Sequence, residues 1–324
     1  MNEVSTARNA DSVTAGQAED TAPPEVTVVV PAYRGRATIL ACLGSIQKAA
    51  ARWRCEVIVV ESSGDGAAEL VRERFPEVTV IASPARLTAG KARNEGLSRA
   101  RGRWLLCVDQ DCLVPVDWID RLVDLLRQPG TGAAGGSIDV ANPANLSGWC
   151  VYFVEFLGHF PSRGAVRTDN FLIGANSAWN PEVLSKVRFP DQTLGEDLLL
   201  SEEVRRKGLA VRYDPQLTVS HYNREGWGEF VRYCRAMGFA AAVDQGQLGA
   251  KSISILRRMP SLSFAIPLVR LPRIAVRLCG GPSGYLIRFL LLLPCCAYGQ
   301  WVWAASFRKG LMVKAGTGAC AARP

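Results

Sequence analysis

Short apolar runs and amphipathic stretches alternate along the first third of the chain. The apolar runs are rich in β-branched residues and end at turn-forming residues, as strands buried on both faces of a parallel sheet do. The stretches between them have helical spacing. The runs cover residues 26–30, 56–60, 78–81 and 104–108, and the stretches cover 38–50, 67–75 and 89–100. This alternation predicts an α/β fold with a doubly wound sheet flanked by helices and joined by right-handed crossovers.

The following part of the chain contains more helical signals. Helices are expected over residues 118–127, 193–207 and 227–243, and residues 217–219 have the character of a strand. The helix over 193–207 is followed by Gly208, whose missing Cβ suits the left-handed position just past a helix end. The glycine-rich stretch 130–136 is expected to be a loop that enters the second half of the sheet.

The charge balance changes near residue 245. Residues 245–324 contain 11 Lys and Arg and no Asp or Glu, which leaves 27 basic and 30 acidic residues before them. Leu, Ile, Phe and Trp interleave with these basic residues, a composition that favours an anionic membrane surface over nucleic acid as the partner. We therefore expect a basic, hydrophobic, helical tail over 245–324 that associates with membrane, and an α/β domain over 25–244.

The N-terminal residues and the composition of the whole chain add to this picture of the domain organisation. Residues 1–24 are polar and Ala-rich and have no apolar core of a signal peptide, so we expect a disordered leader. The whole chain has 48% hydrophobic and 21% charged residues, which excludes wholesale disorder. Ten cysteines are scattered without metal-ligand spacing, which favours reduced core thiols of a cytosolic protein over a zinc site.

The tail contains one long apolar stretch, at residues 283–305. Its length approaches the roughly 20 residues that cross a bilayer, but Arg288, Pro294 and Gln300 interrupt it. Basic residues flank it on both sides and give no orientation. An interfacial or re-entrant anchor is therefore favoured over a full span, and a helical hairpin packed on the preceding domain remains the alternative. The expected location is the cytoplasmic face of the cell membrane, anchored by this segment.

Two acidic pairs carry the candidate chemistry. Asp109 and Asp111 follow the apolar run 104–108, so they emerge at the carboxyl end of a strand, where open α/β sheets bind ligands. Strand alternation directs both side chains to one side, where two carboxylates can hold Mg²⁺ or Mn²⁺. The other pair, Glu196 and Asp197, opens a helix whose N-terminus favours an ionised carboxylate, as a general base requires. Capping of that helix is the simpler alternative for this pair.

Several blocks along residues 25–240 together resemble the family-2 glycosyltransferases of the GT-A fold. The order and spacing of the blocks match that family, which implies a mixed GT-A sheet, a nucleotide-sugar donor, a divalent metal and inverting transfer. The blocks are Val28-Val29-Val30-Pro31-Ala32-Tyr33, Val57-Ile58-Val59-Val60-Glu61-Ser62-Ser63, Gly90-Lys91-Ala92-Arg93-Asn94-Glu95-Gly96, Asp109-Gln110-Asp111 and Gly195-Glu196-Asp197.

The resemblance also implies a role for each matching residue. Asp197 would be the catalytic base with Glu196 beside it, Asp111 would bind the metal, and Asp109 would lie near the ribose, the diphosphate and the metal. His221 would complete the metal or diphosphate site, although a half-buried structural imidazole is an equal alternative. The nucleotide would contact Pro31, Ala32, Tyr33, Glu61, Arg93 and Asn94.

Three positions depart from the family pattern. Arg34 stands where the family commonly has Asn, Glu61 replaces the usual Asp, and Val187-Arg188-Phe189 replaces Gly-Gly-Phe before the acidic pair. These departures bear on the identity of the donor. Trp179, which precedes the acidic helix, is expected either to stack on a sugar or to be part of the core.

The favoured function is inverting transfer of a single sugar from a nucleotide-sugar to a membrane-linked or cell-envelope glycan. Single transfer is expected because residues 233–237 lack the Q-x-x-R-W pattern of processive members of the family. A dinucleotide oxidoreductase is disfavoured because no G-x-G-x-x-G follows the first strand. A catalytically inactive sugar-nucleotide-binding or membrane-scaffold protein is the alternative from another class.

Overall fold

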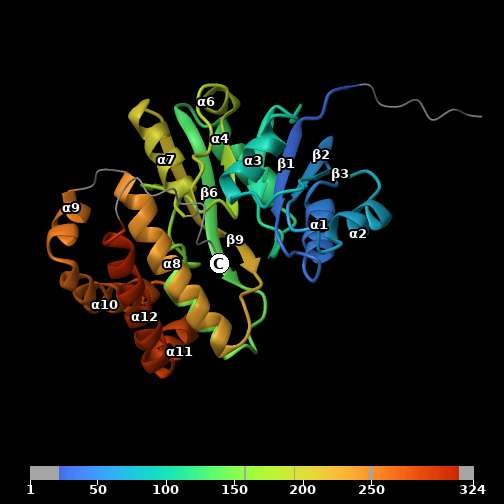
Figure 1. The fold of residues 1–324 in the computed structure, drawn as a ribbon. Coiled ribbons are helices and arrows are strands. Elements are labelled where there is room, and N and C mark those ends of the chain that lie inside the picture. The colour runs from blue at the N-terminus through green and yellow to red at the C-terminus, as the bar shows by residue number, and fades with distance from the viewer. Residues whose placement is uncertain (1–21, 157, 193, 248–250, 314–324) are drawn as a thin grey trace, which may run out of the picture.

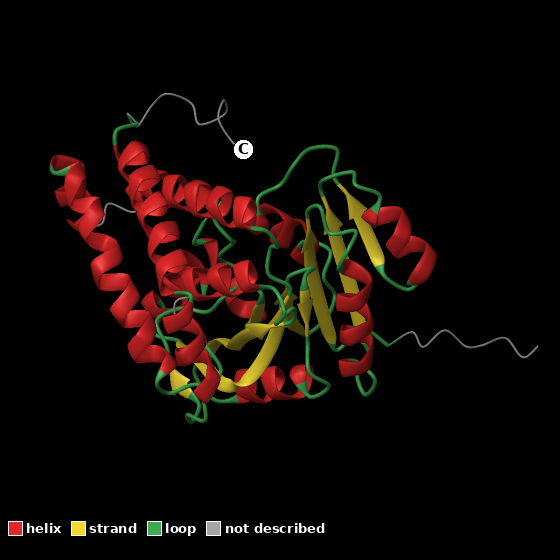
Figure 2. Cartoon of the chain, turned by 90° about the horizontal axis from the view of Figure 1, so that it is seen from below, coloured by secondary structure: helices red, strands yellow, loops and turns green. Residues whose placement is uncertain are grey.

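A mixed sheet with helices on both faces forms the centre of the molecule (Figures 1 and 2). The computed structural model describes residues 22–156, 158–192, 194–247 and 251–313. Most of the expected leader, residues 1–21, lies outside the described residues. The sheet and its helical layers confirm the predicted α/β fold.

The sheet has the strand order β3-β2-β1-β4-β8-β6-β9-β5, and β7 pairs with β9 off this path. Strands β1 to β4 are parallel to one another, whereas β8 runs antiparallel to both of its neighbours, β4 and β6. Strands β6 and β9 are parallel, so their carboxyl ends lie at the same edge as that of β4. The strands are β1 Val26–Ala32, β2 Cys55–Glu61, β3 Thr79–Ala82, β4 Trp104–Val108, β5 Cys112–Leu113, β6 Thr131–Val140, β7 Arg167–Thr168, β8 Asn176–Trp179 and β9 Ala210–His221.

Most helices of the α/β part begin and end close to where the sequence predicts, but α5 and α6 had no predicted counterpart. Thr88 caps α3 by accepting a hydrogen bond from the Lys91 amide, and Asn145 caps α5 in the same way from Gly148. Gly208 has φ 76°, the left-handed conformation expected past the end of α7. These helices are α1 Ile39–Ala49, α2 Ala67–Arg74, α3 Ala89–Leu97, α4 Trp118–Arg127, α5 Leu146–Glu155, α6 Pro181–Leu184, α7 Glu196–Arg206 and α8 Trp227–Gln247.

The prediction of a loop at residues 130–136 was wrong, because this stretch begins the long strand β6. Its glycines are there for close packing. A Cβ on Gly136 would collide with the carbonyl oxygen of Leu217, and one on Gly135 would lie 2.6 Å from that of Asn176. The neighbouring strands thus approach too closely for side chains at these two positions, so glycine is compatible with a buried strand here.

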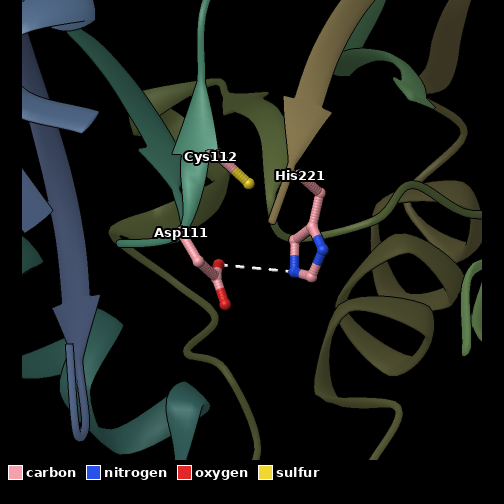
Figure 3. A group of neighbouring side chains, drawn as sticks. All are labelled: Asp111, Cys112 and His221. Atoms are coloured by element: carbon pink, nitrogen blue, oxygen red, sulfur yellow. Dashed lines mark ion pairs between the residues drawn. The ribbon is translucent and has the colours of Figure 1, made fainter. Parts of the chain in front are cut away.

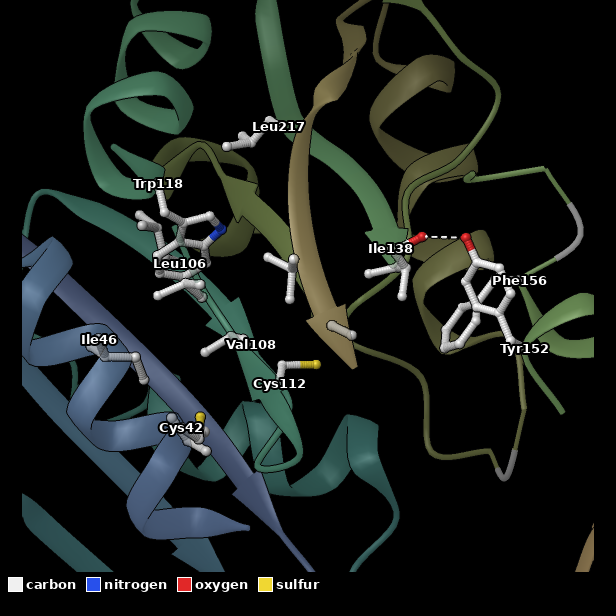
Figure 4. Close-up of a cluster of buried hydrophobic side chains, with 14 of the residues drawn as sticks. Cys42, Ile46, Leu106, Val108, Cys112, Trp118, Ile138, Tyr152, Phe156 and Leu217 are labelled. Carbon is white, nitrogen blue, oxygen red and sulfur yellow. Dashed lines mark hydrogen bonds between the residues drawn. The ribbon is translucent and has the colours of Figure 1, made fainter. Parts of the chain in front are cut away.

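Apolar side chains from the sheet and from both helical layers fill the core. Figure 4 shows part of it, where Leu106, Trp118 and Leu217 lie between the sheet and α4. On the other side of the same figure Tyr152 of α5 donates a hydrogen bond to the carbonyl oxygen of Ile138. This bond ties α5 to β6 and fixes the helix near the carboxyl edge of the sheet.

The tail forms a group of helices beside α8 (Figure 1). Helix α12 packs closely along α8, since the Cα of Gly238 approaches the backbone of Trp303 and that of Gly299 approaches the ring of Phe230. Helix α8 itself runs past residue 244, where the charge balance changes. The tail elements are α9 Lys251–Arg258, the 3-10 helix η1 Pro260–Ala265, α10 Ile266–Leu278, α11 Ser283–Leu291 and α12 Leu293–Leu311.

The outer surface of the tail is unusually apolar. Leu268 and Val276 of α10 are 65% and 72% exposed, and Leu291 of α11 is 77% exposed. Within the described ranges no individual helix is long and apolar enough to cross a membrane. Helices α11 and α12 meet the length and composition requirement only as a pair, across a bend of 69°.

Candidate active site

The carboxyl ends of β1, β4 and β9 bring the first acidic pair and a histidine to one edge of the sheet. Asp109 and Asp111 leave the end of β4, and Gln110 between them points elsewhere. The Gln110 amide accepts a hydrogen bond from the Tyr33 amide and donates one to the Tyr33 carbonyl, both at 2.8 Å. This side chain therefore fixes the loop after β1 against the acidic loop after β4.

Asp111 faces His221, the last residue of β9 (Figure 3). The distance from Asp111 Oδ1 to His221 Nε2 is 3.3 Å. Burial alone would raise the pKa of Asp111, but the charge of His221 and its hydrogen bond lower it below the usual range. The pKa of His221 is raised to about 9, because the attraction of Asp111 outweighs burial, which would lower it. The strand end therefore holds a carboxylate against a cation.

The same group of atoms can hold a metal ion. Ligand atoms of Asp111, Cys112 and His221 all lie within 4.8 Å of one another. Burial raises the pKa of Cys112 well above its usual value, so its thiol is neutral and a poor ligand for a hard cation. The nearby carboxylate and imidazole are suitable ligands for Mn²⁺ or, through oxygen, Mg²⁺.

The orientation of His221 also suits a metal ligand. Its Nδ1 lies 3.0 Å from Asn223 Oδ1, which can only accept, so Nδ1 carries the proton of the neutral ring. Without a metal, the attraction of Asp111 keeps a proton on Nε2 as well. A divalent cation would replace that proton and bind the Nε2 lone pair, and a second hydrogen bond that fixes the tautomer is typical of histidine ligands. The residues present therefore fit a divalent metal.

Arg93 of α3 joins the two acidic pairs. Its side chain is 2% exposed, and its guanidinium contacts Asp109 at 2.8 Å and Glu196 at 2.6 Å. Burial raises the pKa of Asp109 above its usual value, although Arg93 opposes this shift; burial also raises the pKa of Glu196. The structure thus directs Asp109 toward Arg93 and leaves Asp111 as the carboxylate beside His221.

Asp197 occupies the first turn of α7, with its carboxylate held by backbone amides. Its Oδ2 accepts a hydrogen bond from the Gly174 amide at 2.9 Å, and its Oδ1 accepts one from Leu198 at 2.8 Å. The side chain is only partly buried. Among the residues that the structure describes, no cationic side chain lies within ion-pair distance of Asp197, whereas Glu196 pairs with Arg93.

The expected base-binding residues surround the loops after β1 and β2. Pro31 and Ala32 are the last two residues of β1, and the ring of Tyr33 lies under the Arg86 guanidinium at 4.6 Å. Arg34, which replaces the usual Asn, has φ 55°, a left-handed conformation in which Asn is enriched.

Glu61 shapes the neighbouring loop. It is 2% exposed, and it accepts hydrogen bonds from the amides of Ser63 and Gly64 and from the Ser63 hydroxyl. The Ser63 hydroxyl in turn accepts a bond from the Arg34 amide at 2.9 Å, so the two loops are linked.

Two other expected residues have structural contacts. Asn94 makes a pair of hydrogen bonds with the backbone of Phe189, at 2.8 and 3.0 Å, which fixes the segment before α7. Trp179 is fully buried in β8 against Phe189, so the alternative of a sugar-stacking ring is wrong and the core assignment holds.

Sequence reasoning gave no role to Gln110 or Asn223, which both build the site. The Gln110 side chain bonds the backbone of Tyr33, and Asn223 positions His221. The position of Gln110 between two functional carboxylates was the available signal for that residue. Asn223 gives no comparable signal, because its partner is recognisable only once β9 is known.

Comparisons with known proteins relate the chain to glycosyltransferases. Residues 27–181 match the model of the family described as glycosyl transferase family 2. The succinoglycan biosynthesis protein ExoO of Rhizobium meliloti is 35% identical over 121 residues, which cover 37% of this chain and 34% of that protein. An N-acetylglucosaminyltransferase of the same organism is 29% identical over 138 residues, 41% of this chain and 32% of that protein. The chain thus spans about a third of the length of these curated relatives.

A solved structure matches the fold over most of the chain. The mannosyltransferase PcManGT from Pyrobaculum calidifontis, in complex with GDP-Man and Mn²⁺, has a TM-score of 0.57 and 23% sequence identity. The match covers 90% of this chain and 88% of the mannosyltransferase. It therefore extends beyond the residues matched by the family model and includes much of the tail.

Proposed function

We propose that this chain, whose residues 27–181 belong to glycosyl transferase family 2, transfers one sugar from a nucleotide-sugar donor to a glycan acceptor at a membrane. The observation that carries the proposal is the arrangement of Asp111 with His221 at the carboxyl edge of the sheet, and of Asp197 on the facing helix α7. Asp111 and His221 are suited to bind a diphosphate and its metal ion, and Asp197 is suited to accept the proton of a hydroxyl group.

The donor is proposed to bind across the loops after β1, β2 and β4. Tyr33 offers an aromatic surface to the nucleotide base, and Glu61 maintains the shape of the adjoining loop through its hydrogen bonds. Gln110 holds Tyr33 at a fixed distance from the two aspartates. A donor can therefore find its base site and its diphosphate site already arranged, which lowers the entropic cost of binding.

Asp111 and His221 would hold a divalent cation, Mg²⁺ or Mn²⁺, with Asp109 beside them. When bound, such an ion neutralises the negative charge that develops on the departing nucleoside diphosphate. Arg93 keeps Asp109 in place through the ion pair at 2.8 Å. The positive charge of Arg93 offsets the repulsion that Asp111 exerts on Asp109.

Asp197 is proposed as the general base. It accepts the proton of an acceptor hydroxyl, whose oxygen attacks the anomeric carbon while the bond to the diphosphate breaks. A single displacement of this kind inverts the configuration at that carbon. The hydrogen bonds from Gly174 and Leu198 stabilise the ionised carboxylate that must accept the proton.

Membrane association through the tail is proposed from its surface. Exposed apolar side chains, such as Leu268 and Val276, share α10 with the exposed basic residues Arg273 and Arg277. Apolar burial and attraction to anionic lipid would act together on such a surface. The location that follows is the cytoplasmic face of the membrane, where nucleotide-sugars are made.

The experiment that tests the function is a donor screen with the purified chain. UDP- and GDP-sugars are incubated with Mn²⁺ or Mg²⁺, and nucleoside diphosphate release is measured with and without chelator. We expect release from one donor class that chelator abolishes. Binding of a nucleotide-sugar without any release, under every metal and acceptor tried, would instead support the alternative of an inactive sugar-nucleotide-binding protein.

A further inference from the structure

We propose that an open groove beside the active site binds the acceptor as an amphiphile, with a saccharide in its polar half and a lipid chain in its apolar half. This inference rests on the proposed function and names the class of acceptor. The polar half is formed by the loops that follow β6 and β9, and the apolar half lies between α8 and α12. Trp227, the first residue of α8, lines both halves.

The polar half has the size and the chemistry of a saccharide site. Its volume is about 560 Å³, within the range of roughly 300–1,000 Å³ that ligand pockets occupy. Amide and carboxylate groups of Asn142, Asn145 and Glu225 line it together with the Ser147 hydroxyl. Trp227 is 47% exposed at its border, so its ring presents a flat apolar surface beside polar groups. Sugars expose the same combination of hydroxyls and C–H faces.

Direct hydrogen bonds connect the polar half to the candidate active site. Asn142 Nδ2 donates to the Asn223 carbonyl at 2.8 Å, and the Asn223 amide donates to Asn142 Oδ1 at 3.0 Å. Asn223 then contacts His221 through its side chain. Asn142, which lines the groove, is thus joined through the buried Asn223 to the proposed metal ligand, so the polar half lies near the site of transfer.

The apolar half differs completely in character. It has a volume of about 280 Å³, and apart from a tyrosine hydroxyl its side chains bear no oxygen or charge; its lining is Trp227, Phe230, Val231, Pro294, Cys295 and Tyr298. It lies just after the 69° bend between α11 and α12. Leu290 and Leu291, at the end of α11, are 52% and 77% exposed next to that bend. The groove therefore continues into an apolar surface, as a site for a chain that extends into lipid would.

This division along one groove favours an amphiphile over a free glycan. A soluble saccharide would leave the apolar half unfilled, whereas an acyl or polyprenyl chain would cover it and remove its apolar surface from water. A lipid-linked saccharide joins both chemistries in one molecule. Its linkage would lie over Trp227, and its sugar would point toward His221 and Asp197.

The test compares n-octyl glucoside, below its micelle concentration, with methyl glucoside as probes of the intact chain. Calorimetry is performed with nucleoside diphosphate and Mn²⁺ present. We expect the octyl compound to bind at least tenfold more tightly. Tyr298→Glu, which introduces a charge into the apolar half, should reduce that advantage to less than threefold. Trp301→Ala is the matched control, because Trp301 is also an exposed aromatic residue of α12, at 40%, but does not line the groove.

Two outcomes would overturn the inference. One is equal affinity for the two glucosides, and the other is an equal loss in Tyr298→Glu and Trp301→Ala. A melting temperature within 2 °C of the unchanged chain verifies that Tyr298→Glu is folded. Nucleoside diphosphate release from the donor is measured in parallel on the unchanged chain. Release without amphiphile binding refutes only the acceptor class, whereas absence of release refutes the proposed function itself.

Discussion

Asp109 and Asp111 are two residues apart but have different surroundings. Burial raises the pKa of Asp109 despite its contact with Arg93, whereas the charge of His221 brings the pKa of Asp111 below its usual range. Asp111 is therefore the more readily ionised of the two, and it lies beside an imidazole that can share a cation. Asp109 connects this position to α3 and α7 through Arg93.

Asp111→Asn should weaken metal-dependent donor binding, because a neutral amide is a poorer ligand for a hard cation. Titration of the donor with and without Mn²⁺ measures the effect. We expect the gain in donor affinity that Mn²⁺ gives to be at least tenfold smaller in the variant than in the unchanged chain. Asp124→Asn is a useful control, since Asp124 is an exposed carboxylate of α4 whose ion pair is with Arg127 of the same helix. Unchanged metal dependence in Asp111→Asn would remove Asp111 from the metal site.

Substitutions of the two neighbouring acidic residues at the start of α7 should affect different properties, the rate of transfer in one case and the stability of the fold in the other. Asp197→Asn keeps an oxygen for the Gly174 amide but cannot accept a proton, so transfer should fall by about 10²–10⁴ while stability and donor binding remain. Glu196→Gln removes a charge from the buried pair with Arg93, so unfolding should become easier by about 3 kcal/mol. Single-turnover rates and urea unfolding separate the two effects. A similar loss of stability in both variants would mean that Asp197 is a structural residue.

The sequence could identify the functional residues whose position is set by the strand or helix next to them in the chain. Asp111 and Asp197 follow a recognisable strand and open a recognisable helix, so their positions were predictable. The contact of Arg93 with Glu196 spans 103 residues, and that of Gln110 with Tyr33 spans 77. No local pattern encodes such distant contacts. The resemblance placed Arg93 and Asn94 near the nucleotide, but it could not show that Arg93 also contacts Glu196 or that Asn94 bonds the Phe189 backbone.

At the scale of elements, β6 shows how close packing overrides local propensity. Its sequence, Thr131-Gly132-Ala133-Ala134-Gly135-Gly136, has the composition of a loop. The strand forms because β8 and β9 lie on either side of it and their backbones need the space that side chains would fill. By contrast, β1 and β2 consist of β-branched residues that pack as strands in any parallel sheet, so their bounds were predicted nearly correctly.

Gly136→Ala should therefore destabilise the protein by about 3 kcal/mol, because the new methyl group would press on the Leu217 carbonyl. Gly44→Ala is the matched control. Gly44 lies inside α1 with no atom within 4 Å of an added Cβ, so this change should stabilise by about 0.5–1 kcal/mol. Urea unfolding monitored by circular dichroism compares the two. If Gly136→Ala were as stable as the unchanged chain, the strand would have to pack less tightly than described.

At the scale of the whole molecule, the tail both packs on the α/β part and presents an apolar exterior. Gly238, Gly299 and Gly310 let α8 and α12 approach closely, and Phe307 is buried between them. Removing residues 251–324 would therefore uncover the apolar side of α8 as well as remove any membrane contact. Substitutions on the outer face of α10 can test membrane binding without disturbing this packing.

The double variant Leu268→Glu, Val276→Glu should bind anionic vesicles about a hundredfold more weakly than the unchanged chain, because each side chain contributes roughly 1.5 kcal/mol or more when buried in lipid. Both residues are on α10 and highly exposed, so the fold should tolerate the change. Val116→Glu is the control, since Val116 is 70% exposed but lies on the loop before α4. Co-sedimentation with phosphatidylglycerol vesicles measures binding.

Raising the salt concentration should weaken binding of the unchanged chain without abolishing it, because screening acts only on the basic residues. Equal sedimentation of all three proteins would show that α10 does not face the membrane, and would leave the tail with a packing role alone.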